Sequence, residues 1–146
     1  MDCQMGEIDM EQQWLSVTLK TEEGDVYARV AYHLRDVLSD SQYSRSVWFQ
    51  LDALPTAEFD DYIRDLDELE DAVKCGMEKI HGCKMLLVLT GAGYRDLVFA
   101  LRDDAEAIEE AIQALAADHP NRWHSKVFQS PKFGPFPALV SGVAAT

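Results

Sequence analysis

The sequence predicts a single α+β domain. Several short segments alternate apolar and polar residues with a period of two, which is typical of strands that bury one side. Two longer segments repeat their apolar residues every three or four positions, as amphipathic helices do. The chain has 146 residues, 47% of them hydrophobic, so its length and composition suit one domain with a well-buried core.

The first three strands are expected in the N-terminal third of the chain. Residues Trp14–Lys20, WLSVTLK, alternate strictly, and Asp25–Leu34 alternate again after the turn TEEG, so these two segments predict a hairpin with Gly24 in its loop. Residues 35–44 are polar and predict a loop with room for one helical turn. Aromatic and β-branched residues then predict a third strand over Arg45–Leu51.

The first helix is expected after Pro55, where the apolar period changes. Thr56 is its expected N-cap, and Gly82 ends a periodic stretch of about 24 residues. The apolar side of this helix comprises Phe59, Tyr62, Ile63, Leu66, Leu69, Val73, Met77 and Ile80.

Three more strands and a second helix are predicted after Gly82. The continuous apolar run Lys84–Thr90 is typical of a central strand that is covered on both faces. The turn GAG at 91–93 leads to a partner strand over Tyr94–Leu101. A helix is then expected over Asp103–Asp118, and a last strand over Trp123–Gln129.

After the first hairpin, the predicted order is strand, helix, strand, strand, helix, strand. This is the βαββαβ order of a ferredoxin-like fold, an antiparallel sheet whose right-handed crossovers place both helices on one face. The other face is expected to be covered in part by the hairpin, the C-terminal tail or a second subunit. We expect a flexible arm over residues 1–13, one domain over 14–136 and a partly ordered tail over 137–146. The residues expected in the core include Ile63, Leu66, Leu86, Val88, Val98, Phe99, Ile108 and Leu115.

Three motifs in this framework resemble the domain-of-unknown-function 695 family. In that family a Leu-Pro with a following acid opens the first helix, which Leu54, Pro55 and Glu58 match. A Thr-x-x-Gly-x-Arg hairpin follows, which is matched by Thr90, Gly93 and Arg95, while Trp14 suits an early tryptophan. The resemblance covers approximately Trp14 to Phe136.

The closing motif of the family is altered in this chain. Ser130 stands in place of an acid, and Phe133 and Phe136 stand in place of the expected Trp and Tyr. The family resembles, in fold and acidity, the regulator of ribonuclease activity B, a small protein that inhibits a ribonuclease by binding it. The resemblance implies a ferredoxin-like domain without a known catalytic site, and it singles out Arg95, either as a structural partner for an acid or as a ligand-binding residue.

The charge of the chain restricts its classes of partner. The formal net charge is −13, from 26 acidic and 13 basic residues. Nucleic acids and anionic membranes select basic surfaces, so neither is expected as a direct partner, whereas a basic protein is. The three cysteines form no disulfide framework, and the N-terminal stretch lacks the apolar core of a signal peptide. No segment reaches the roughly 18 apolar residues of a membrane span. We therefore expect a cytoplasmic protein.

Both predicted helices carry many acids. Within Phe59–Val73 a single base, Arg64, lies among seven acids, and those from Asp65 onward are too far from the N-terminus for the helix dipole to stabilise them. Such uncompensated repulsion favours a surface shaped by a cationic partner, although a plainly solvated acidic surface would show the same pattern. The candidate partner-binding residues are Asp61, Asp65, Asp67, Glu68, Asp71, Glu106, Glu109 and Glu110.

The sequence contains no convincing catalytic, cofactor or metal motif. Cys75, His81 and Cys83 lack the spacing of a zinc site, and the fourth candidate ligand, Cys3, lies in the N-terminal arm. Trp14 is expected either to pack in the core of the domain or to take part in a binding surface. We expect a non-enzymatic inhibitor, regulator or immunity-type protein whose acidic helices dock on a basic partner such as a nuclease or toxin. The alternative is an enzyme or a small-molecule-binding domain with a pocket between the sheet and the hairpin, near Arg95. A homodimer through the open sheet face is also conceivable.

Overall fold

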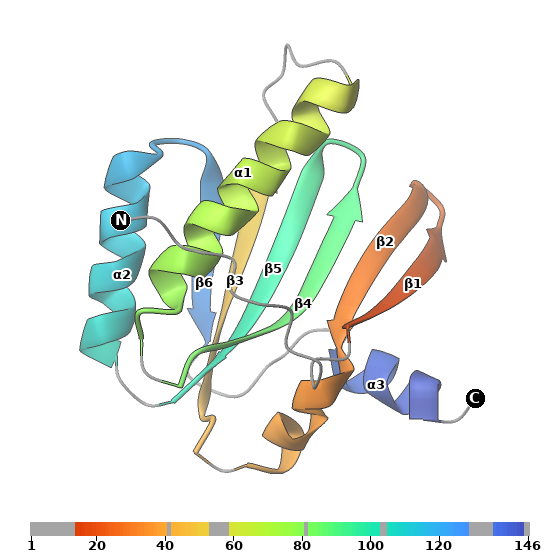
Figure 1. Ribbon diagram of the computed structural model, residues 1–146, viewed down its shortest axis with the longest axis horizontal. Helices are drawn as coiled ribbons and strands as arrows, with labels where there is room; N and C mark the ends of the chain where they lie inside the picture. Colours follow the sequence, from red (N-terminus) through yellow and green to blue (C-terminus); the bar gives the residue numbers. More distant parts are fainter. Residues whose placement is uncertain are drawn as a thin grey trace.

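The computed structural model of the protein describes residues 14–40, 42–52, 59–80, 82–102, 105–128 and 136–144, with the backbone alone at 59–62, 105 and 142–144. These residues form one six-stranded antiparallel sheet and three α-helices (Figure 1). The mixed α and β class predicted from the sequence is therefore confirmed.

The sheet has the strand order β1-β2-β4-β5-β3-β6, and all its neighbours are antiparallel. Its strands are β1 (Trp14–Thr21), β2 (Gly24–Ala31), β3 (Arg45–Asp52), β4 (Lys84–Gly91), β5 (Tyr94–Leu101) and β6 (Trp123–Phe128). Strands β4 and β5 lie at the centre of the sheet, where apolar residues on both of their sides are buried.

The helical elements are η1 (Tyr32–Ser39, a 3₁₀ helix), α1 (Phe59–Met77), α2 (Ala105–Asp118) and α3 (Phe136–Ala144). Two of them differ from expectation. Strand β2 ends at Ala31, and residues 32–34, which were expected to extend it, begin η1 instead. The helix α3 occupies the stretch expected to be a partly ordered tail, because its Phe136 and Val140 are buried against the rest of the protein.

Helices α1 and α2 cover one face of the sheet, which we call the helix-side face (Figure 1). Leu66 and Val73 of α1 and Ile108 of α2 pack there with Phe49 and Phe99 of the sheet, and all five are essentially inaccessible to solvent. The rings of Phe49 and Phe99 meet edge to face, with centroids 5.8 Å apart. This cluster is the larger of the two described cores.

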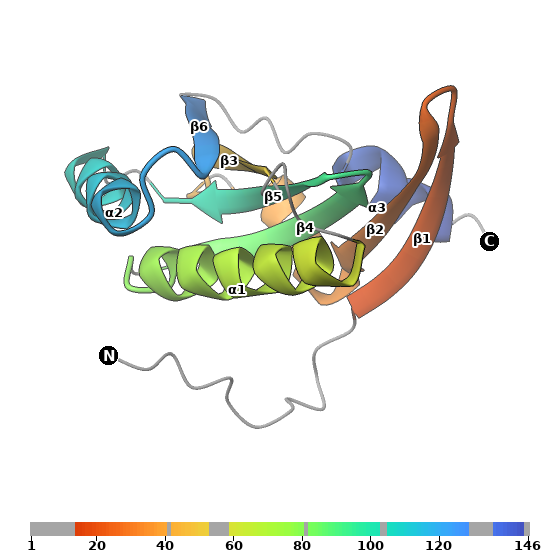
Figure 2. The same ribbon diagram turned by 90° about the horizontal axis from the view of Figure 1, so that it is seen from above.

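Elements η1 and α3 cover part of the other face, which we call the opposite face. Figure 2 shows α1 and α3 on different sides of the sheet. Val37 of η1 and Phe136 of α3 pack there with Val30, Leu87 and Val98 of the strands. The expectation that the C-terminal segment helps to cover this face is thus confirmed for Phe136, Leu139 and Val140, and η1 and Tyr43 contribute further cover.

Seven of the eight predicted core residues are buried, and Ile63 is half-buried. They do not share one core, however. Leu86 and Val98 lie on the opposite face, whereas Leu66 and Phe99 lie on the helix-side face. The register of β4 shifts between Met85 and Leu87, which is a local irregularity that no sequence period reveals.

Helices α1 and α2 approach closely at Gly76. A Cβ atom at this position would lie only 2.7 Å from a methyl carbon of Leu115. The absence of a side chain therefore allows Leu115, itself 7% exposed, to pack against the α1 backbone. This contact fixes the spacing between the two acidic helices.

Among the described residues, no helix is both long and apolar enough to cross a membrane.

Candidate functional site

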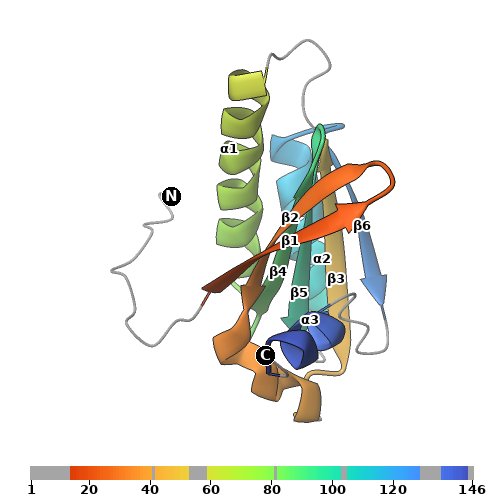
Figure 3. The same cartoon turned by 90° about the vertical axis from the view of Figure 1, so that its right-hand side faces the viewer.

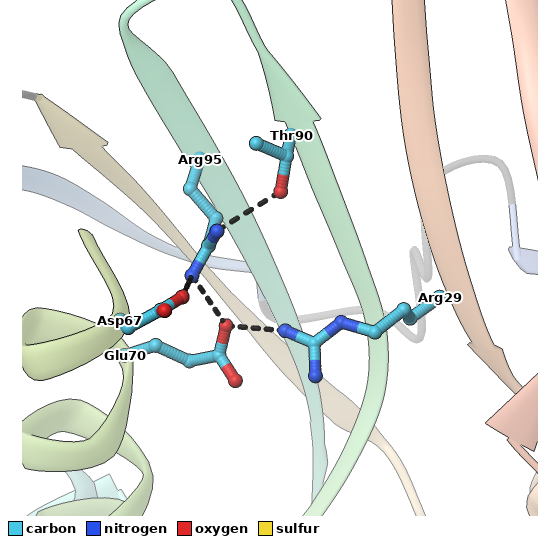
Figure 4. A network of polar contacts seen from close by, with 5 residues as sticks. All are labelled: Arg29, Asp67, Glu70, Thr90 and Arg95. Atoms are coloured by element: carbon cyan, nitrogen blue, oxygen red, sulfur yellow. Dashed lines mark hydrogen bonds and ion pairs between the residues drawn. The ribbon is translucent and has the colours of Figure 1, made fainter. Parts of the chain in front are cut away.

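The acids of α1 that face the sheet meet arginines from three different strands or turns. Arg95 of β5 lies under α1 and is 5% exposed. Its Nη1 atom donates to Asp67 Oδ1 at 2.6 Å and to Glu70 Oε1 at 3.0 Å (Figure 4). Its Nε atom donates to the Thr90 hydroxyl at 2.9 Å, because Thr90 and Arg95 are paired across β4 and β5. The structural role expected for Arg95, holding acids of the first helix, is confirmed.

Glu70 is shared by two arginines. Arg29 Nη2, from β2, donates to the same Glu70 Oε1 at 2.5 Å, so the glutamate links β2 to both α1 and β5 (Figure 4). Glu70 is 7% exposed, and a buried carboxylate needs such partners because removal from water is costly. The two arginines with Asp67 and Glu70 form a group of zero net charge, which we call the Arg95 network.

A further arginine binds α1 from the turn before β6. Arg122 donates to Asp65 through its Nη2 atom, and the same atom lies 3.4 Å from the backbone oxygen of Asp52. Both side chains of the ion pair are largely buried, with exposed fractions of 22% for Arg122 and 17% for Asp65. This contact joins α1 to the edge of the sheet.

These ion pairs correct one conclusion from the sequence. The acids of α1 appeared to lack local compensation, but Asp65, Asp67 and Glu70 are each paired with an arginine. Asp65 is therefore largely buried in its ion pair, whereas the side chain of Asp67 is 61% exposed. Their role at a docking surface stays a prediction. The side chain of Asp61 lies outside the described residues.

Five of the candidate acids are both exposed and without an ion pair to any residue that the structure describes. They are Glu68 and Asp71 of α1 and Glu106, Glu109 and Glu110 of α2. Helix α2 contains no basic residue in its sequence AEAIEEAIQALAAD. We call these five residues the free acidic surface. They lie on two adjacent helices on the same face of the sheet (Figure 1).

Trp14 has a structural environment. Its side chain packs at the margin of the helix-side core, and its ring contacts that of His33 with the centroids 5.9 Å apart. Because the indole is half-buried by these contacts, it anchors the start of β1 rather than forming a stacking platform.

The alternative function, with a pocket near Arg95, stays a prediction. Arg95 lies beneath α1 on the helix-side face, and its Nε and Nη1 atoms donate to Thr90, Asp67 and Glu70. A ligand at these two nitrogens would have to displace side chains that are already in place.

Cys83 has no reactive character at neutral pH. Burial, together with the negative charge of Glu78 and against a smaller lowering by Lys84, raises the pKa of its thiol to about 12. The thiolate, which is the nucleophilic form, is therefore scarce. Among the described residues, no group of three or more His, Cys, Asp or Glu side chains is placed to hold a metal. Cys3 and His81 lie outside those residues.

The open part of the opposite face contains an unusual carboxyl group that the sequence did not single out. Asp96 lies on β5, opposite Leu89 of β4 and Gln50 of β3. Its Oδ1 atom is buried and has no hydrogen-bond partner among the residues that the structure describes. Burial, and secondarily the charge of Asp52, raises the pKa of Asp96 from 3.8 to about 6. Asp52 of β3 is in turn 3.8 Å from His124, which lies on the edge strand β6 next to β3.

We predict that Asp96 makes the protein less stable as the pH rises from about 4 to about 6. Over this window the folded protein holds a proton that the unfolded chain has lost, so folding is favoured on the acid side. Asp96→Asn should therefore raise the free energy of unfolding at pH 7 by about 1 kcal/mol, a value reduced because the side chain is partly exposed to solvent. The gain should vanish below about pH 4, as measured by urea unfolding across this range.

Asp71→Asn is the matched control, since Asp71 is exposed and has no ion pair with a described residue. It should show no such pH-dependent difference from the wild type. If the Asp96→Asn variant gains the same stability at pH 4 as at pH 7, titration of this carboxyl is not the cause.

The chain was compared with family models, curated proteins and solved structures, and none of the three comparisons found a match. The resemblance to the domain-of-unknown-function 695 family accordingly stays a prediction.

Sequence reasoning missed Arg29, Arg122 and Glu70 as parts of the arginine–acid contacts. Arg29 lies in a strand that alternates polar and apolar residues, so a polar residue at its position does not indicate a special contact. The family motif marked Thr90, Gly93 and Arg95, and the structure gives this motif a physical meaning. Gly93 has a φ of 80° in the turn, which brings Thr90 opposite Arg95.

Proposed function

We propose that this protein is a non-enzymatic interaction protein, of the inhibitor, regulator or immunity type, which binds a basic protein such as a nuclease or toxin. The observation that supports the proposal is the free acidic surface. Its five exposed carboxylates have no ion pair within the described fold, whereas the sheet-facing acids of α1 are neutralised by arginines. A fold that neutralises some acids and leaves others exposed has charge available for a cationic partner.

The proposed interface has its centre on α2 rather than on α1. Glu106, Glu109 and Glu110 lie on a helix without bases, while α1 adds Glu68 and Asp71. Such charges act mainly by steering the encounter, and salt screens them over about 8 Å at physiological ionic strength. Binding should therefore be fast and sensitive to salt.

The arrangement of β3 to β6 supports a ferredoxin-like reading of the fold. Their spatial order β4-β5-β3-β6, with α1 after β3 and α2 after β5, is the order expected for a βαββαβ unit, to which β1 and β2 add at the β4 edge. The Thr90, Gly93 and Arg95 unit likewise supports membership of the domain-of-unknown-function 695 family. The free thiols of Cys75 and Cys83 support a reducing compartment such as the cytoplasm.

The test is charge reversal at the free acidic surface. Glu109→Lys with Glu110→Lys should slow association with the partner by about tenfold at low salt, and the loss should shrink as salt rises. The partner is first captured from an extract of the source organism on the immobilised wild type, and the association rate is then measured with the purified partner. Both positions are exposed, so the stability should change by no more than about 0.5 kcal/mol.

Glu22→Lys with Glu23→Lys is the matched control. These residues form the exposed turn between β1 and β2, and the change in net charge is the same. Glu68→Lys with Asp71→Lys tests the contribution of α1 in the same way. If the α2 variant and the turn variant bind equally well at low salt, the acids form only a solvated surface and the proposed function is wrong.

A further inference from the structure

Strand β1 is an edge strand whose outer side is unpaired. It pairs with β2 over eight positions and stands at the end of the strand order, and no other described strand lies beside it. Figure 3 views the protein from this side, with β1 and β2 nearest to the reader. An edge strand presents backbone N–H and C=O groups to solvent, and these can pair with another strand.

The β1 edge lacks the features that usually protect such an edge. Its sequence WLSVTLKT contains no proline, and its register with β2 is continuous, without a bulge. Lys20 is its only charged residue and is paired with Asp25 at 3.3 Å. The opposite edge of the sheet, β6, is shorter and exposes His124 and Lys126 along its length. Of the two edges of the described sheet, β1 is therefore the one open to pairing in its central part.

A neighbouring strand would also bury the side chains of β1 further. Leu15, Val17 and Leu19 point to the opposite face and are each only half-buried, although their partners on β2 include the fully buried Val30 and Ala28. Ser16 and Thr18 point to the helix-side face and are exposed. A further strand would extend both the apolar row and the polar row.

We infer that the occupant of this edge is a second copy of the same chain, which pairs antiparallel to β1 about a two-fold axis at Val17. Two-fold pairing at this register places Val17 opposite Val17 and Leu15 opposite Leu19. It also places Ser16 opposite Thr18, and the Trp14 ring opposite Lys20, which is a favourable contact between a cation and an aromatic ring. Over Trp14 to Lys20 no like charges face each other, and Leu15, Val17 and Leu19 meet only one another.

The charge of the chain also favours this edge for self-association. Each copy carries a net charge of −13, so two copies repel wherever acids face each other. From Trp14 to Leu19 the strand has no charge at all. The edge lies at the far end of the sheet from α2 and β6, so pairing leaves the free acidic surface accessible (Figure 1). The inference thus goes beyond the proposed function and does not depend on it.

The test is the oligomeric state of the full chain by analytical ultracentrifugation, from about 1 μM to about 1 mM. The wild type should show a reversible monomer–dimer equilibrium. Ser16→Asp with Thr18→Asp should weaken it by about tenfold or more, because each new aspartate faces another across the axis. Mixing this variant with Ser16→Lys and Thr18→Lys should restore dimers, since opposite charges then face each other.

The matched control is Gln113→Asp with Ser125→Asp, which adds the same charge at exposed positions away from β1. This variant should dimerise like the wild type, and circular dichroism should confirm that all variants are folded. A wild type that stays monomeric up to about 1 mM would overturn the inference, as would a dimer that the β1 aspartates leave unchanged or that the mixed variants fail to restore.

Discussion

Leu66→Ala is expected to lower the free energy of unfolding by about 2–5 kcal/mol. Leu66 is inaccessible to solvent and packs in the core between α1 and the sheet. Alanine would remove its buried methyl groups and leave a cavity that the neighbouring helix and strands can only partly fill. Urea unfolding of the variant should show a lower midpoint with an unchanged dependence on denaturant.

Arg64→Ala is the appropriate control for Leu66→Ala. Arg64 lies in the same helix two positions away and is exposed, so its loss should change stability by no more than about 0.5 kcal/mol. An unfolding midpoint that Leu66→Ala leaves in place would show that α1 does not pack on the sheet as described. Gly76 and Leu115 would then need to be examined in the same way.

Arg95→Met is expected to cost about 3–5 kcal/mol of stability, because it breaks a buried ion pair and leaves Glu70 with Arg29 alone. The side chain of Glu70 is 10% exposed, so water cannot replace the lost guanidinium. Asp67, whose side chain is 61% exposed, should be affected much less. Thermal or urea unfolding measures the loss.

A double-mutant cycle separates the ion pair from the packing of the arginine stem. Arg95→Met combined with Glu70→Leu replaces both charges by apolar groups, which should recover much of the stability that Arg95→Met loses. Arg64→Met serves as the exposed control. If the two single effects simply add, the coupling energy between Arg95 and Glu70 is zero, and their contact contributes nothing to stability.

The fold could be predicted in large part because its periodic signals are local. The alternation of Trp14–Lys20 and the continuous apolar run of Lys84–Thr90 gave strands that the structure contains, each with one further residue. The prediction failed where tertiary contacts decided the outcome. Residues 32–34 continue the alternation of β2 yet form a helical turn. The segment Phe136–Ala144 forms a helix, and its Phe136 is buried in the core on the opposite face of the sheet.

The candidate site was predicted less well. The family motif drew attention to Arg95, but its partners Asp67 and Glu70 are 28 and 25 residues away. Arg29 and Arg122 reach α1 acids that are 41 and 57 residues away. The burial and raised pKa of Asp96 could not be predicted, because a single acid in an apolar strand is expected to face solvent until its spatial neighbours are known.

The sequence by itself determined the six strands and the helices α1 and α2, the strong negative charge and the concentration of acids on these two helices. Only the tertiary structure decided which of those acids are neutralised. Asp65 and Glu68 look alike in the sequence, yet one meets Arg122 and the other faces solvent without a described ion pair. The reason is physical: the energy between two charges depends on their separation in space and on their burial, and neither quantity follows from separation along the chain.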